Sequence, residues 1–272
     1  MRLLLWLIFL FVPHPLFTQS AFVNSPTSMG RGATGVTGAD TWSPILNPAG
    51  TSEAVGPSIS LSYHLPYFVN QLSSKNLLAV LPFRFGVLSV NVHQYGYPLY
   101  QENKLSMAFA RTLAPHLHAS FQLNFQNNHL SQSGAGSQLF AGLGILYKPL
   151  NAVRLGFLIS NPEQSSISIM ESTSNIPTLF VLGFNWSAST HFDISCEVEK
   201  QSRFDMLYKL GLEYNINQQV WIRTGILGKP INYTLGLGFD VMGIMLDAGM
   251  AHHEVLGISS CFGISYQFKA KQ

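Results

Sequence analysis

The sequence predicts an all-β fold, a transmembrane antiparallel β-barrel of about fourteen strands. Three observations predict it. Only 10% of the residues are charged and 47% are hydrophobic, which leaves too few charges to solvate the surface of a soluble protein of this size. From Gly56 onward, apolar and polar residues alternate with the period of a strand that has two different faces. The connections between these strands alternate between short and long, as they do at the two ends of a membrane barrel.

Residues 1–20 have the features of a secretory signal. Arg2 supplies a positive start, Leu3 to Val12 is an apolar run, and Ser20 places a small residue before an expected cut near Ala21. The run is too short to cross a bilayer as a helix, which needs about 20 residues. We therefore expect export and cleavage rather than a helical anchor.

Residues 21–55 differ from the rest because they are rich in Gly, Pro, Ser and Thr and show no sustained alternation. Three glycines have the GxGxxG spacing that also occurs in phosphate-binding loops: Gly30, Gly32 and Gly35. No strand precedes them, and Pro44 and Pro48 would interrupt the helix that such a loop requires. We predict neither a nucleotide site nor a cofactor in this segment.

The barrel is expected to occupy residues 56–272. The alternation is clearest from Leu117 to Phe125, where apolar residues oppose His118, Ser120, Gln122 and Asn124. A helix would scatter these residues around its axis. An even number of strands is what bacterial barrels require. We predict fourteen strands, near residues 57–64, 76–82, 86–95, 104–112, 116–126, 137–148, 152–160, 178–188, 190–199, 206–216, 219–227, 232–241, 243–251 and 258–268.

The expected connections fall into two classes. The tight ones lie at residues 82–85, 113–115, 149–151, 188–189, 217–218 and 242. The long ones lie at residues 65–75, 96–103, 127–136, 161–177, 200–205, 228–231 and 252–257. Because external loops are the long ones in such barrels, both termini are expected in the periplasm. A soluble β-sandwich is the alternative, but its exposed rows should carry Lys, Glu and Asp, whereas here the charges stand among Gly, Ser and Asn.

Charged residues on the polar rows are expected to point into the barrel. Cross-strand and cross-lumen ion pairs would stiffen the wall, or the same charges would line a solute path. These residues are Arg154, Asp193, Glu197, Glu199, Lys209, Glu213, Arg223, Asp240 and Asp247. Inward glycines would let another segment approach the wall closely, or would permit strand coiling. They include Gly142, Gly144, Gly211, Gly236 and Gly238.

Other chemistry has little support in the sequence. A net charge of +2 without a Lys/Arg cluster argues against a nucleic-acid partner. His118 and Ser120 share a face, as in a lipid-cleaving pair, but that face is predicted to point inward, away from lipid. No set of ligands suggests a metal site. Cys196 is expected to face outward and Cys261 inward, so both thiols should be free. We predict that the protein is not an enzyme.

The N-terminal segment resembles a known motif. The stretch from Met29 to Asp40, followed by Asn47, Pro48, Ala49 and Gly50, is similar to the start of FadL-like outer-membrane proteins, including the PorV/PorQ group associated with type IX secretion. Weaker similarity extends through residues 146–149, 155–156, 159–161, 233–239 and 263–268. The last four strands resemble the PorV/PorQ group more than the fatty-acid transporters.

The resemblance implies a fourteen-stranded barrel in the outer membrane of a Gram-negative bacterium, with residues 21–55 folded into the lumen as a plug, or hatch. It also implies two alternative functions. The first is an accessory barrel that binds secretion-machinery or surface proteins during export or surface attachment. The second is a FadL-like channel for small hydrophobic molecules. The hatch motif would consist of Gly30, Gly32, Gly35, Asn47, Pro48, Ala49 and Gly50.

Overall fold

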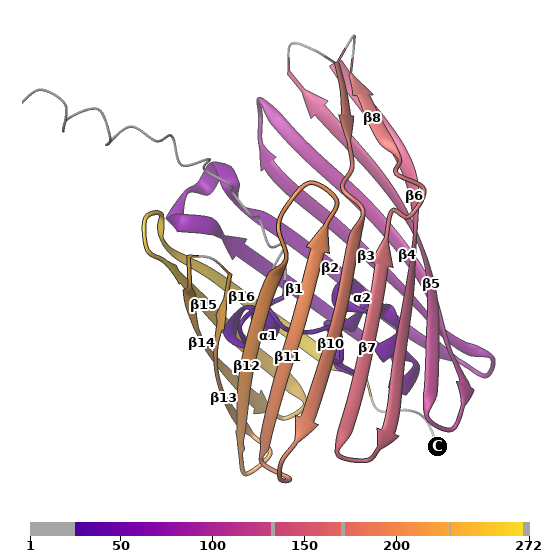
Figure 1. The fold of residues 1–272 in the computed structure, drawn as a ribbon, viewed down its shortest axis with the longest axis vertical. Helices are drawn as coiled ribbons and strands as arrows, with labels where there is room; N and C mark the ends of the chain where they lie inside the picture. The colour runs from indigo at the N-terminus through magenta and orange to yellow at the C-terminus, as the bar shows by residue number, and fades with distance from the viewer. Residues whose placement is uncertain (1–24, 132–133, 170–171, 229, 269–272) are drawn as a thin grey trace, which may run out of the picture.

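A computed structural model describes residues 25–131, 134–169, 172–228 and 230–268. The expected signal at residues 1–20 lies outside this part of the chain. Fourteen strands close an antiparallel barrel in which β1 pairs with β16 (Figure 1), so the predicted fold class is confirmed. The barrel strands are β1 (Ser58–Leu65), β2 (Ser74–Phe83), β3 (Gly86–Tyr97), β4 (Tyr100–Ala114), β5 (Leu117–Leu130), β6 (Gly134–Leu150), β7 (Val153–Ser160), β10 (Leu179–Ser187), β11 (Phe192–Gln201), β12 (Leu207–Ile216), β13 (Val220–Leu227), β14 (Asn232–Val241), β15 (Ile244–His253) and β16 (Gly257–Gln267).

The two faces of the wall have opposite chemistry. On β5, Phe121 and Leu123 point outward and are 48% and 43% exposed, whereas Ser120 and Asn124 point inward and are buried. The same alternation of exposed and buried residues recurs on β1, β2, β10 and β14. An apolar outer face over a polar interior is the arrangement that lipid requires of a barrel. Among the described residues, no helix is long and apolar enough to cross a membrane.

The main error in the predicted elements concerns strand length. Residues 96–103 and 127–136 were expected to be long loops, but β4, β5 and β6 extend into these ranges. The full lengths of the three strands are 15, 14 and 17 residues. The connections that remain are residues 98–99 and 131–133. The link between β15 and β16 is also short, at residues 254–256. The strict alternation of short and long connections is therefore wrong, and the wall is taller along β3 to β6 (Figure 1).

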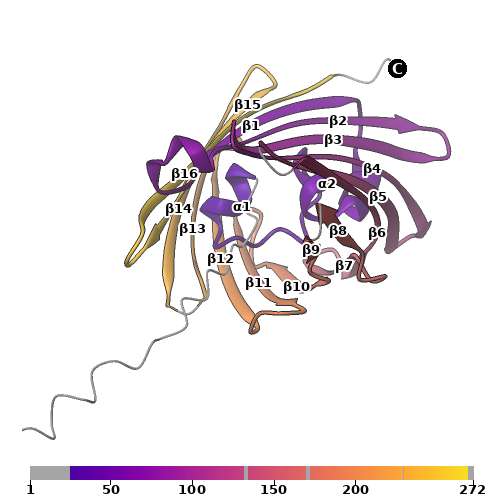
Figure 2. The same cartoon turned by 90° about the horizontal axis from the view of Figure 1, so that it is seen from above.

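The connection between β7 and β10 contains a hairpin, β8 (Ser166–Ile169) and β9 (Ser172–Asn175), where the sequence predicted only a loop. Asn161 anchors the base of this connection with a side chain that donates to the carbonyls of Ser165 and Ile176. Ile167 is buried, and a Cβ added to Gly136 of β6 would meet it at 2.8 Å. The hairpin therefore packs on the inner surface of the tall side of the wall (Figure 2).

Both cysteines are free, as predicted. Cys196 is exposed on the outer face of β11, and Cys261 is buried on the inner face of β16. The barrel interior contains little apolar packing, and its described apolar cluster is formed by Val36, Leu158 and Val181, with Leu179 beside it. Hydrogen bonds and ion pairs therefore make most of the specific contacts inside the barrel.

Candidate functional site

Residues 25–55, here called the lumen segment, lie inside the ring of strands (Figure 2). The segment contains α1 (Pro26–Gly30), α2 (Ser43–Leu46) and the 3-10 helix η1 (Pro48–Glu53). Ser25 caps α1 through its hydroxyl, and Asn47 caps η1, which begins at a proline. The helix α1 contacts β13 to β16, whereas η1 contacts β3 to β6. The segment therefore spans the lumen between two sides of the wall.

The glycines of the lumen segment permit two kinds of close packing. A Cβ on Gly30 would lie 2.6 Å from Cα of Gly236 on β14, so two backbones meet without side chains. Gly32 has a positive φ of 60° and lies against Gly225 of β13. Gly35 instead leaves space for Leu46 of the lumen segment itself. The first two of the three predicted motif glycines therefore pack on the backbone of the wall, whereas Gly35 contacts the wall through its N–H, which donates to Glu197 of β11.

Wall glycines match this packing in part. Gly144 faces Asn47 and Gly211 faces Arg31, in addition to the Gly236 contact, as close approach of a second segment requires. Gly142 and Gly238 do not contact the lumen segment, since their space is filled by neighbouring wall side chains. Five further wall glycines contact it without having been predicted to do so: Gly156, Gly183, Gly225, Gly249 and Gly263.

Asn47 is the most connected residue of the predicted Asn-Pro-Ala-Gly element. Its amide nitrogen Nδ2 donates to the carbonyl of Val36 at 2.7 Å and to the carbonyl of Ile145 on β6 at 3.1 Å. Its Oδ1 accepts from the backbone N–H of Ala49 at 3.2 Å. The side chain is fully buried. Pro48 begins η1, and Gly50 lies against the carbonyl of Gly38, so the element holds the segment to itself and to the wall.

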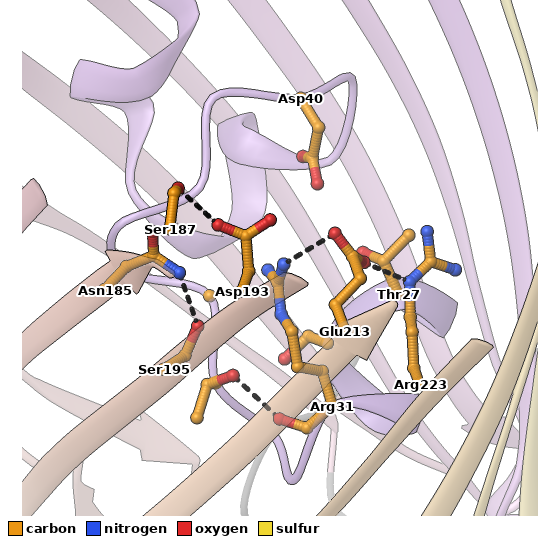
Figure 3. A network of polar contacts seen from close by, with 12 residues as sticks. Thr27, Arg31, Asp40, Asn185, Ser187, Asp193, Ser195, Glu213 and Arg223 are labelled. Carbon is orange, nitrogen blue, oxygen red and sulfur yellow. Dashed lines mark hydrogen bonds and ion pairs between the residues drawn. The ribbon is translucent and has the colours of Figure 1, made fainter. Parts of the chain in front are cut away.

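An ion-pair network connects the lumen segment to β12, β13 and β15, and Figure 3 shows its part formed by Arg31, Glu213 and Arg223. Arg31 of the segment pairs with Glu213 at 3.6 Å. Arg223 pairs with Glu213 at 2.5 Å and with Asp247 at 2.7 Å. The indole Nε1 of Trp42 donates to Asp247 at 3.3 Å. Two wall carboxylates thus bind both the wall and the lumen segment.

A second network lies on β11 and β12. The backbone N–H groups of Gly35 and Val36 both donate to the carboxylate of Glu197. Lys209 balances this charge, with Nζ 3.9 Å from Glu197 and 2.6 Å from Glu199. A buried carboxylate that accepts backbone N–H groups and faces an ammonium group is well compensated. The network fixes the turn that follows α1.

Three predicted lumen charges make no ion pair within the described residues. Asp193 accepts from the hydroxyl of Ser187 at 2.5 Å (Figure 3), and Asp240 accepts from the backbone N–H of Gly243 at 2.9 Å. Arg154 stands opposite Asn185 in the ladder between β7 and β10. Ion pairs among the predicted lumen charges are formed instead by Glu197, Glu199, Lys209, Glu213, Arg223 and Asp247.

A third connection was not predicted. Glu53 of η1 pairs with Lys148 of β6 at 2.5 Å and lies 3.5 Å from Nε2 of His118. The hydroxyl of Ser52 is 2.8 Å from Nδ1 of the same histidine. His118 therefore ties the lumen segment to β5. Its inward direction was predicted from the alternation, but its partners could not be identified without the position of η1.

A cavity of about 740 Å³ lies beside the lumen segment at the end of the barrel where β1 begins and β16 ends. The segment supplies Arg31, Asp40 and Trp42 to its lining, and the wall supplies Trp221 and Asp240, among others. The volume is within the range of about 300–1,000 Å³ that is usual for small-molecule sites. Apolar rings and charged groups share this space.

Another part of the wall contains buried polar groups that have no hydrogen-bond partner among the described residues. Ser60 Oγ is on β1, and Ser89 Oγ and Asn91 Oδ1 are on β3. Ser60 and Asn91 flank Leu78 in one row of the sheet. A buried polar group without a partner costs about 1–3 kcal/mol. These three polar atoms on β1 and β3 therefore gain no hydrogen bond from the lumen segment.

Comparisons with known proteins identify the fold. No protein-family model and no curated protein sequence matches the chain. Among solved structures, the CymD monoaromatic hydrocarbon channel aligns with a TM-score of 0.71 at 13% identity, over 91% of this chain and 98% of that one. The Pseudomonas putida toluene transporter TodX gives a TM-score of 0.65 at 12% identity, over 89% and 96%. A Pseudomonas aeruginosa FadL homologue gives 0.63 at 10%, over 90% and 98%.

This chain has the fold of FadL-like channels. The FadL part of the sequence resemblance is therefore supported, whereas the PorV/PorQ part and its link to secretion are not. The structures that the chain resembles are described as channels and transporters, not as enzymes. At such low identity the likeness concerns the fold alone.

Proposed function

We propose that the protein is an outer-membrane channel for small hydrophobic molecules. The observation that carries the proposal is a fourteen-stranded barrel, shaped like known hydrocarbon channels, whose lumen is occupied by a separate segment next to a cavity of small-molecule size. The apolar outer face supports a position in lipid. The proposal includes periplasmic termini and the absence of an enzymatic role.

Passage of a molecule through the barrel requires the lumen segment to move. The distribution of the contacts of this segment favours movement away from one side of the wall. Glu197, Glu213 and Asp247 bind it on β11, β12 and β15. On β1 and β3, the hydroxyls of Ser60 and Ser89 are buried and have no hydrogen-bond partner among the described residues. Movement away from β1 and β3 would let water satisfy these groups, which offsets part of the cost of opening. We infer that the passage opens along β1 to β3.

Transport of a hydrophobic probe tests the proposal directly. The mature protein would be placed in vesicles that carry lipopolysaccharide in the outer leaflet. Lipopolysaccharide slows the passage of hydrophobic molecules through the lipid. The entry of an uncharged fluorescent aromatic compound into the vesicles would then be followed. We expect faster entry than in vesicles without protein. Disruption of residues 47–50 should abolish the faster entry of the probe, because Asn47 positions the lumen segment against β6. Entry no faster than in empty vesicles would refute the channel.

The export-accessory hypothesis predicts a different result. An accessory barrel would co-purify from native membranes with large envelope proteins and would not speed entry of the probe. No contact in the described structure favours this hypothesis over the channel. Parallel purification in mild detergent would therefore separate the two functions in the same preparation.

A further inference from the structure

We propose that the cavity beside the lumen segment binds hydrophobic organic cations, that is, amines or quaternary ammonium ions with an aromatic or alkyl body, in preference to carboxylates of the same shape. The inference rests on the proposed channel, because it specifies which hydrophobic molecules the channel favours. Three features carry it: the charge balance of the lining, the way two carboxylates are held, and the rings beside them.

The lining carries more negative than positive charge. Its carboxylates are Asp40, Glu53, Glu213, Asp240 and Asp247, and its cations are Arg31 and Arg223. Both arginines are engaged in ion pairs with Glu213 or Asp247. Glu53 pairs with Lys148, which lies behind the lining.

Two carboxylates are left over from these pairs. Asp40 and Asp240 make no ion pair with any described residue, so the cavity has two uncompensated negative charges.

Backbone groups hold these two carboxylates in place. Oδ1 of Asp40 accepts from the backbone N–H of Trp42 at 2.9 Å, and Oδ1 of Asp240 accepts from the backbone N–H of Gly243 at 2.9 Å. Figure 3 shows the carboxylate of Asp40 directed toward the space above Arg31 and Glu213. Each carboxylate is thus oriented through one oxygen, which leaves the other available to a ligand. Such fixed charges need little reorganisation when a cation arrives.

Apolar and aromatic groups complete the cavity. Trp221 and Phe268 line it together with Met245 and Val80. An aromatic face attracts a cation within about 6 Å of its centre, and it also packs against an apolar body. A carboxylate-bearing ligand would find both arginines already paired, and it would be repelled by Asp40 and Asp240. A cleft lined by one sign of charge raises the local concentration of opposite charges.

Three probes that share one naphthyl ring test the inference: an uncharged derivative, a primary amine and a carboxylate. Binding to the detergent-purified mature protein would be measured by equilibrium dialysis, and entry would be measured in the vesicles described above. We expect the amine to bind roughly tenfold more tightly than the carboxylate at low salt, the lower end of the effect of focused charge. The ratio should shrink at high salt, because exposed charges are screened.

Asp240→Asn and Asp40→Asn are the informative variants, since asparagine keeps the oxygen that accepts the backbone N–H. Each should lower the ratio of amine to carboxylate binding. Glu254→Gln is the matched control, because it removes the same charge from the connection between β15 and β16, which does not line the cavity. Heat-dependent migration on gels would verify that each variant retains a folded barrel.

The outcomes separate this inference from the channel. Equal binding of amine and carboxylate, or equal effects of Asp240→Asn and Glu254→Gln, would overturn the cation site even if the uncharged probe enters the vesicles. Preferential binding of the amine without entry of any probe would support the site and refute the channel. Failure of all three probes to bind would refute the site.

Discussion

Single glycines determine how closely the lumen segment approaches the wall. At the contact of Gly30 with Gly236, neither residue has a side chain, and the hydroxyl of Thr234 on the same strand donates to the carbonyl of Gly30 at 3.0 Å. The same hydroxyl accepts from the backbone N–H of Gly32 at 2.9 Å. Hydrogen bonds between a side chain and a backbone at this distance require the backbone of α1 to lie directly on the wall. The glycines make that approach sterically allowed.

Gly236→Ala should therefore destabilise the protein by about 1–3 kcal/mol, the usual cost of overpacking. Its new Cβ would lie 2.7 Å from Cα of Gly30, where backbone has to move. The free energy of unfolding, measured with urea in lipid vesicles, checks this. The control is Gly142→Ala, whose Cβ would meet the flexible side chain of Gln122 at 3.2 Å and the backbone oxygen of Ile159 at 3.4 Å, an ordinary contact distance. Equal losses in the two variants would contradict the close contact.

Asn47→Ala should loosen the lumen segment, because the carbonyls of Val36 and Ile145 lose the amide that bonds to both. We expect a loss of about 1–3 kcal/mol in the free energy of unfolding and faster hydrogen exchange in residues 36–50. Asn127→Ala is the control, since Asn127 also donates to Gly136 and Ser137, but between strands of the wall. Unchanged exchange in the lumen segment of Asn47→Ala would show that Asn47 does not hold it.

Residue roles were predictable where local chemistry decides them. The resemblance to FadL-like proteins singled out Asn47 and Gly30, and the structure has them as a buried cap and a side-chain-free contact, which each need one residue type. The sequence could not identify Glu213 as the partner of Arg31, or Thr234 as the partner of Gly30. Those partners depend on the register of the barrel and on the depth of the segment within it, and neither is encoded locally.

Strands were predictable to within a few residues wherever they face lipid. The alternation on β14 gave its bounds at residues 232–241, and the structure has the same bounds. The start of β4 and the end of β5 were missed because their outer face is polar there. Gln101 and Asn103 lie on that face of β4, and Asn127 and His129 lie on that face of β5. Beyond the hydrocarbon layer the outer face need not be apolar, so a paired strand no longer shows the pattern.

The buried hydroxyl groups of β3 and β11 allow a prediction about opening. Ser89→Ala removes a hydroxyl that has no partner, so it should stabilise the closed arrangement by about 1 kcal/mol and slow entry of a hydrophobic probe about fivefold. Ser195→Ala is the control, because Ser195 is equally buried but accepts from Asn185 at 3.0 Å. It should destabilise the wall instead. Slower entry in both variants, or in neither, would argue against opening along β1 to β3.

The whole molecule is a wall that closes on itself and a segment that depends on the wall. All fourteen strands pair with both neighbours, and these ladders need no contribution from residues 25–55. The lumen segment, in contrast, has three short helices and takes its hydrogen bonds and ion pairs from β5, β6, β11, β12, β14 and β15. The wall should therefore survive without the segment, whereas the segment would not keep its structure alone.

Deletion of residues 25–55 should consequently leave a barrel that still migrates as folded protein on unboiled gels and that conducts ions freely. The physical reason is that the polar inner face, freed of the segment, fills with water. Conductance across planar bilayers, compared with that of the complete mature protein, is the measurement. A folded deletion variant that conducts no more than the complete protein would show that the segment does not block the lumen.

The environment of two tryptophans tests most directly whether the outer face of the barrel contacts lipid, because one of them lies on that face and the other lies inside the barrel. Trp186 is 46% exposed on the outer face of β10, and Trp42 is buried in the lumen segment. In variants of the mature protein that also lack Trp221, so that Trp186 or Trp42 is the single tryptophan, we predict that lipids brominated in their chains quench Trp186 and leave Trp42 unaffected. Quenching of Trp186 by aqueous iodide rather than by brominated lipid, or quenching of Trp42 by the lipid, would contradict the account.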